Sequence, residues 1–201
     1  MTTLGNTNSA RTPSGMRVTK TSYVQLEKDA ATLRPALPVK DDAQSKYNLD
    51  VLRILEETLP KAGFNFHIAA TAELKECAAF TVPSKKLIVL REDVYEGIFE
   101  DAVFSRSTVI HELAHIALDH ETKLYRGVTI GEHQFCEDSE WQAKAMTVAL
   151  MMPLEACRLA RNATELAAMC GTSIQAASYR LERLYKSGGI KRQQSLWGSV
   201  S

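Results

Sequence analysis

A long stretch without glycine or proline, residues 102–119, constrains the fold more than any other part of the sequence. Its apolar residues recur at helical spacing, so it predicts one helix with an apolar face. That face consists of Val109, Ile110, Leu113, Ile116, Ala117 and Leu118. Hydrophobic residues make up 45% of the 201-residue chain, so a core can cover this helix without help from disulfides.

The same helix carries His111-Glu112-Leu113-Ala114-His115, an HExxH pattern. Residues four apart lie one turn apart on one face, so the two imidazoles can bind one metal ion together. Glu112 points to the flank of that face, where its carboxylate can take a proton from water at the metal. The alternative is a helix whose histidines are only polar surface. The pattern predicts a zinc site in which Glu112 is the catalytic residue.

A catalytic zinc site of this kind needs a third protein ligand and one open position. No HExxHxxGxxH pattern is present, so a carboxylate from a following helix is a better candidate than the third histidine of a metzincin. The downstream candidates are His120, His133, Glu137, Asp138 and Glu140. Glu140 has a structural alternative, as a helix charge that pairs with Lys144. Ser139 and Gln142 match a capping box, which predicts a helix start at this point.

The rest of the chain predicts a small sheet followed by helices. Alternating or apolar runs at 64–68, 78–82 and 87–90 predict strands, with a turn at 83–86. Helical spacing predicts helices over 23–33, 48–59, 94–99 and 140–152, and shorter ones after Pro153. Pro60 and Gly63 are expected to end the second of these helices. The predicted fold class is α+β, mainly helical.

The first residues, 1–20, are rich in Thr, Ser, Asn and Gly and predict disorder. They lack the apolar core of a secretory signal, and the sequence has no apolar run long enough to span a membrane. The four cysteines are scattered, with no CxxC pair. These features together predict a cytoplasmic protein without a disulfide framework.

The net charge is zero, but the charge is unevenly distributed along the chain. Residues 1–40 carry six Lys/Arg and two Asp/Glu, and residues 154–201 carry seven and three. The middle therefore holds eleven Lys/Arg and nineteen Asp/Glu. An acidic middle argues against a protein that chiefly binds nucleic acid, and it is compatible with a bound cation.

Three motifs together resemble the ImmA/IrrE family of metallopeptidases: the HExxH pattern, Glu140-Trp141-Gln142-Ala143, and Ala149-Leu150-Met151-Met152-Pro153. The resemblance covers roughly residues 49–184. It implies a zincin-like domain with one zinc ion per chain, the ligands His111, His115 and Glu140, and Glu112 as the catalytic acid/base. Family members often have Asn and Phe where this chain has Lys144 and Met146, and a histidine where Asp119 stands.

The domain organisation expected is a largely disordered or extended segment over 1–45, the metallopeptidase domain over 46–187, and a flexible tail over 188–201.

Four further residues are candidates for support of the site. Asp119 lies four residues after His115 and could accept the second N–H of that ligand, although it could also be a plain helix-terminal residue. The role of the neighbouring His120 stays open. Tyr125 and His133 lie between the motifs, where a side chain that stabilises an oxyanion is expected, and an ordinary surface position is the alternative for both.

A pair of helices over 164–184 resembles a helix-turn-helix, with Gly171 in the turn and Ser173 as the N-cap of the second helix. The second helix opens with Ile174-Gln175-Ala176-Ala177, which is poorly suited to reading bases. We therefore expect the pair to pack on the catalytic domain, without binding DNA. In that case Leu166, Ala167, Leu181 and Leu184 are buried, and Arg180 and Arg183 are solvated.

The resemblance implies a zinc-dependent endopeptidase that cleaves a partner repressor of the helix-turn-helix class and so relieves repression. No helix-turn-helix precedes the zinc motif, so the repressor is expected to act in trans. The alternatives are a DNA-binding or repressor-binding module with a non-catalytic zinc site, and a zinc hydrolase that acts on something other than protein.

Overall fold

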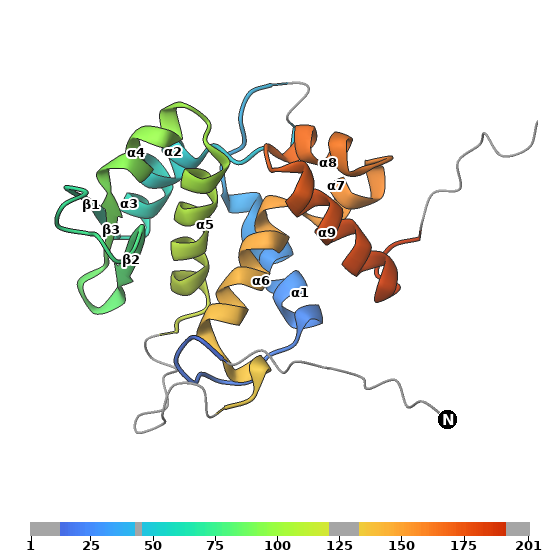
Figure 1. Ribbon diagram of the computed structural model, residues 1–201, viewed down its shortest axis with the longest axis horizontal. Helices are drawn as coiled ribbons and strands as arrows, with labels where there is room; N and C mark the ends of the chain where they lie inside the picture. Colours follow the sequence, from blue (N-terminus) through green and yellow to red (C-terminus); the bar gives the residue numbers. More distant parts are fainter. Residues whose placement is uncertain (1–12, 43–45, 121–132, 192–201) are drawn as a thin grey trace, which may run out of the picture.

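The computed structural model describes residues 13–42, 46–120 and 133–191 (Figure 1). These residues form a small three-stranded sheet and a larger set of helices, so the α+β, mainly helical class is confirmed. None of the helices in these ranges has both the length and the apolar character that a membrane span requires.

The sheet consists of β1 (Asn65–Ala69), β2 (Ala79–Val82) and β3 (Leu87–Arg91), in the order β1-β3-β2. The central strand β3 pairs parallel with β1 and antiparallel with β2. Its residues Ile88 and Leu90 are fully buried, as expected for the middle of a covered sheet. The edge strand β2 lies against the long helix that carries the zinc motif, and all three strands match their predicted positions.

The helices follow the predicted order closely. Before the sheet come α1 (Tyr23–Leu33), η1 (Arg34–Ala36), α2 (Val51–Arg53), η2 (Ile54–Thr58) and α3 (Leu59–Lys61). The turn η3 (Pro83–Lys85) joins β2 to β3, and α4 (Glu92–Phe99) and α5 (Val103–Ala117) follow the sheet. The last group is η4 (Phe135–Glu137), α6 (Ser139–Met151), α7 (Leu154–Leu159), α8 (Ala163–Cys170) and α9 (Ile174–Lys186).

One helix end differs from the prediction at Pro60. The helical stretch runs from α2 through the π-helix η2 into α3, and it passes Pro60 before it ends at Lys61. In the wider π turn the N–H of Leu59 bonds to the carbonyl of Ile54. The chain then reverses at Gly63, whose φ of 83° favours glycine.

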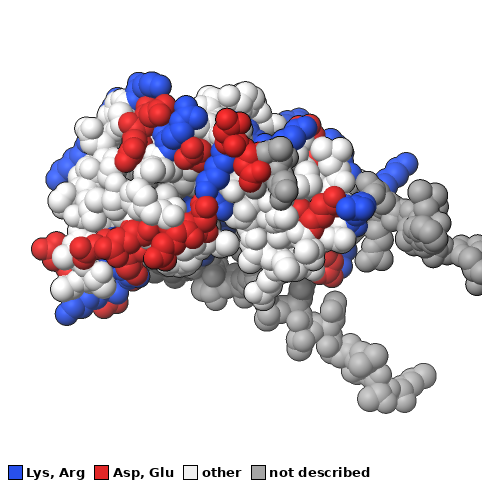
Figure 2. Space-filling model, turned by 90° about the horizontal axis from the view of Figure 1, so that it is seen from above, with Lys and Arg blue, Asp and Glu red and all other residues white. Residues whose placement is uncertain are grey.

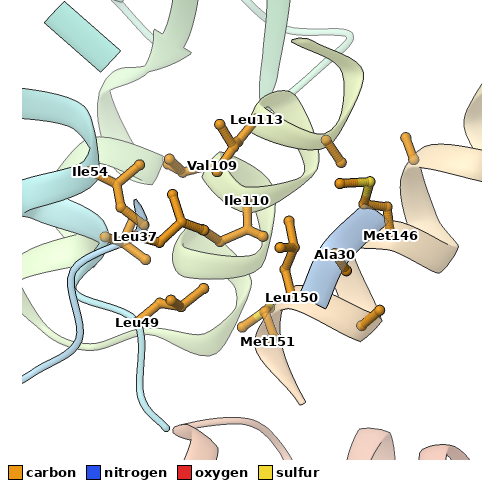
Figure 3. Close-up of a cluster of buried hydrophobic side chains, with 14 of the residues drawn as sticks. Ala30, Leu37, Leu49, Ile54, Val109, Ile110, Leu113, Met146, Leu150 and Met151 are labelled. Carbon is orange, nitrogen blue, oxygen red and sulfur yellow. The ribbon is translucent and has the colours of Figure 1, made fainter. Parts of the chain in front are cut away.

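The main core surrounds α5 (Figure 1). This helix packs between the part of the molecule that contains the sheet and the helices α1 and α6. In Figure 3, Val109 of α5 lies on the side of Ile54, and Ile110 lies on the side of Leu150 of α6. Val109 and Ile110 are fully buried. Of the apolar face predicted for α5, Val109, Ile110, Leu113 and Leu118 are buried, Ile116 is partly buried and Ala117 is exposed. The face that carries the histidines lines a cleft.

A second core lies among α7, α8 and α9, and it includes Tyr47 and Met152. The buried side chain of Arg106 in α5 ties the turn between α8 and α9 to the rest of the molecule, because it donates to the Gly171 carbonyl and the Asn48 side chain. Gly171 has a φ of 61°, and a Cβ there would meet both of these side chains closer than 3 Å. The α8–α9 pair is therefore an integral part of the domain.

The prediction of disorder over residues 1–20 is wrong for residues 13–20. Residues 13–21, called the N-terminal strap below, run beside the segment that precedes α6 (Figure 1). The N–H of Val18 donates to the Glu137 carbonyl at 2.7 Å, the N–H of Thr21 to the Cys136 carbonyl at 3.1 Å, and Val18 is 1% exposed. Backbone hydrogen bonds of this kind do not depend on side-chain identity, so a polar composition did not prevent ordered packing.

Candidate metal centre

Helix α5 presents His111 and His115 one turn apart on the face opposite its buried apolar residues. The imidazole rings are 4.7 Å apart between centroids, and their Nε2 atoms are 3.2 Å apart. Both side chains are partly exposed, at 21% and 17%. Two nitrogens on one helix face can therefore converge on a single point.

Glu140 completes this group from the first turn of α6, which packs along α5. Its Oε2 lies 3.3 Å from His111 Nε2, and its Oε1 lies 3.2 Å from His115 Nε2. The three side chains offer ligand atoms that all lie within 4.8 Å of one another. Hydrogen bonds from His111 and His115 hold the pKa of Glu140 well below its usual range. Two imidazoles and an ionised carboxylate are a donor set that fits zinc.

The start of α6 fixes the position of Glu140, but not through the capping box predicted at Ser139 and Gln142. The N-cap is Asp138, whose Oδ1 accepts the N–H of Trp141 at 2.7 Å. Its Oδ2 accepts the N–H of Gly15 from the N-terminal strap at 2.8 Å. The helix begins one residue earlier than the capping box requires, so Gln142 is free to point inward.

Glu112 is 6% exposed, and its Oε2 accepts a hydrogen bond from the Thr81 hydroxyl at 2.6 Å. Thr81 belongs to the edge strand β2, so the sheet and α5 meet at this carboxylate. Sequence reasoning missed Thr81, because a threonine in a strand is common and nothing local links it to Glu112.

His120 and Asp119 have different surroundings. Helix α5 ends at Ala117, and Asp119 takes a left-handed φ of 53° and is exposed. This turn brings His120, which is 5% exposed, back to His115, with the two Nδ1 atoms 2.8 Å apart. Asp119 was the candidate partner of the second ring nitrogen of His115, but His120 occupies that position.

The structure does not place the other candidate residues beside His111 and His115. His133 Nε2 lies 3.2 Å from the Asp138 carboxylate, and its side chain is fully buried beneath the start of α6. Glu137 pairs with Arg17 of the strap at 3.0 Å. Tyr125 lies outside the described residues. Among the candidates for the third ligand, the structure thus brings Glu140 to the two histidines of the motif.

The three side chains and Glu112 line a cleft of about 830 Å³ bounded by β2, α5 and α6. Much of the remaining lining is apolar, including Phe80, Val82 and Val148. Lys144 is the one Lys or Arg among the described lining residues, and its Nζ lies 3.9 Å from Glu140 Oε2. An extended peptide could lie along β2 in this cleft with a backbone carbonyl near the histidines.

The α8–α9 pair has the predicted geometry, with Gly171 in the turn, Ser173 as N-cap, and the four predicted apolar residues buried. The prediction for Arg180 is wrong. This side chain is 2% exposed and makes a bidentate pair with Glu27 of α1, while the Arg183 guanidinium lies over the ring of Tyr23. Solvation was expected because the helix pattern shows only that Arg180 is polar, and its partner lies far away in the sequence.

Two of the basic side chains of α9 thus face the protein interior or α1. On the face shown in Figure 2, acidic side chains gather in a band and Lys and Arg are dispersed among them. Neither these side chains of α9 nor the face in Figure 2 offers the continuous basic surface that DNA binding requires.

Comparisons with known proteins agree with this site. Residues 104–182 match the model of the IrrE N-terminal-like domain, a family of peptidases. The match begins in α5, includes both histidines, Glu112 and Glu140, and extends into α9. A comparison with curated protein sequences finds no match. The family match confirms the resemblance drawn from the motifs, because residues 104–182 are similar to the IrrE N-terminal-like peptidase domain of the ImmA/IrrE family.

Proposed function

We propose that this protein is a zinc-dependent endopeptidase with one zinc ion held by His111, His115 and Glu140. The observation that carries the proposal is the convergence of three ligand atoms, from two helices, beside the buried carboxylate of Glu112 in an open cleft. Three protein ligands that leave a position open are the arrangement of catalytic zinc sites.

Zinc in such a site supplies Lewis-acid polarisation of the scissile carbonyl and activation of the attacking water. Glu112 accepts the proton of that water and passes it to the leaving amine. The Thr81 hydroxyl holds Oε2 of this carboxylate, and proton transfer is assigned to Oε1, for which no hydrogen bond is found among the described residues. Glu140 offers a carboxylate, which binds a metal in its ionised form.

We further propose that the substrate is a repressor of the helix-turn-helix class that acts in trans, and that cleavage relieves repression. The resemblance to the ImmA/IrrE family supports this role. The cleft is open and largely apolar, which suits an extended segment of a protein chain. Direct DNA binding is no part of the proposal, because Arg180 and Arg183 are engaged within the fold.

Incubation of the zinc-loaded protein with the helix-turn-helix regulators encoded nearest to its gene tests the proposal. We expect cleavage at a single site by the wild type, and a loss of at least a hundredfold in rate, about the contribution of a general base, in Glu112→Gln with zinc still bound. Glu96→Gln, an exposed change on α4, is the matched control and should cleave normally.

Metal analysis tests the ligands separately. Glu140→Ala should lower the zinc content, whereas a surface charge at this position would leave it unchanged. If the wild type binds zinc but cleaves none of these regulators, the site is a binding site and the peptidase proposal for these substrates is wrong.

A further inference from the structure

The neighbours of Gln142 determine which way its side-chain amide faces. Gln142 is 3% exposed, and its Nε2 lies 2.8 Å from the Thr19 carbonyl and 2.9 Å from the Cys136 carbonyl. Both carbonyls only accept, so the NH₂ group must face them. The Oε1 atom therefore faces His120, at 3.2 Å from its Nε2.

This orientation determines the tautomers of two histidines. Because Oε1 of Gln142 only accepts, His120 Nε2 carries a hydrogen and donates it. In a neutral imidazole the other nitrogen is then an acceptor, and His120 Nδ1 lies 2.8 Å from His115 Nδ1. When zinc takes the lone pair of His115 Nε2, the hydrogen of that ring is on Nδ1, and His120 Nδ1 is placed to accept it.

We propose that His120 and Gln142 are positioning residues that fix His115 as the Nδ1–H tautomer, with the N-terminal strap as their anchor. The chain of donors runs from His115 through His120 to Gln142 and ends on the Thr19 carbonyl of the strap and on the Cys136 carbonyl. The proposal rests on the metal site proposed above. It adds that residues outside the family match, in the strap, complete that site.

The strap is held well enough to serve as an anchor. Its backbone bonds to Glu137 and Cys136, and the N–H of Gly15 bonds to the Asp138 carboxylate. A Cβ on Gly15 would lie 2.7 Å from the backbone nitrogen of Glu140, so the strap also contacts the third ligand directly. Two of the three metal ligands are thus supported by this one segment.

Zinc affinity measures the contribution of this chain of hydrogen bonds. Removal of an outer partner of a metal-bound histidine costs about 10–100-fold in metal affinity. We expect His120→Leu and Gln142→Leu each to raise the zinc dissociation constant by about this factor. His120→Asn, whose side-chain oxygen can still accept from His115, should recover part of the loss. Glu96→Gln, an exposed change on α4, is the control and should bind zinc like the wild type.

The decisive measurement uses the zinc-loaded wild-type protein. Long-range ¹H–¹⁵N NMR of the five histidines reports which ring nitrogen carries the hydrogen. We expect His115 as the Nδ1–H form and His120 as the Nε2–H form, with the His115 signal changed in Gln142→Leu. An Nδ1–H form of His120 in the wild type, or normal zinc affinity in a folded His120→Leu, would overturn the proposal. Zinc binding and cleavage by the wild type are measured separately. A failure of the proposed peptidase activity can therefore be distinguished from a failure of this proposal.

Discussion

The pair between Arg180 and Glu27 should be a major contributor to stability. Both side chains are largely buried, at 2% and 18% exposed, and the guanidinium also donates to the Met152 carbonyl at 3.1 and 3.2 Å. Arg180→Met would leave the Glu27 carboxylate without its cation and would remove both guanidinium hydrogen bonds from this carbonyl. Loss of one partner of a buried pair costs about 3–5 kcal/mol, and the remaining exposure of Glu27 places the estimate toward the lower end.

Urea unfolding followed by circular dichroism measures this loss. Lys186→Ala removes a solvated pair from the same helix, with a lysine that is 75% exposed, and should leave the free energy of unfolding nearly unchanged. A double-mutant cycle with Glu27→Gln should give a coupling of about 1 kcal/mol or more. A loss below about 1 kcal/mol in Arg180→Met would refute the reasoning, because it would show that Arg180 is solvated after all.

Three further outcomes follow from the structure. Thr81→Val removes the hydroxyl that holds Glu112, so kcat should fall about tenfold while KM and zinc content, checked by elemental analysis, stay constant. Gly15→Ala places a Cβ 2.7 Å from the Glu140 nitrogen, so thermal unfolding should reveal a loss of about 1–3 kcal/mol, and an unchanged Tm would contradict the packing of the strap. Burial, and then the neighbouring thiol, raises the pKa of Cys170 to about 12, so a thiol reagent at pH 8 should label exposed Cys77 quickly and Cys170 only after unfolding.

The parts of the site that depend on local geometry could be predicted from the sequence. The four-residue spacing of His111 and His115 sets their relation on any helix, and the absence of Gly and Pro over 102–119 predicted that helix. Glu140 came from the family motif, and the structure brings it to the two histidines. The strands were predicted because apolar runs bounded by turn residues depend little on the rest of the fold.

The parts that depend on distant partners or on special backbone could not be predicted. The position of His120 depends on the left-handed turn at Asp119, and the helix pattern alone would have continued past it. The burial of Arg180 depends on Glu27, which lies 153 residues away. Thr81 and Glu112 meet only because the edge strand packs on α5.

The separation between the strap and its partners also has a consequence for folding. Gly15 and Asp138 are 123 residues apart, and their contact closes a loop that spans most of the domain. Closing so long a loop has an entropic cost that only the packed core can offset, so this contact should form late. During synthesis the strap leaves the ribosome long before its partners are made. Retention of metal by a newly made chain would then report that the strap and the start of α6 have come together.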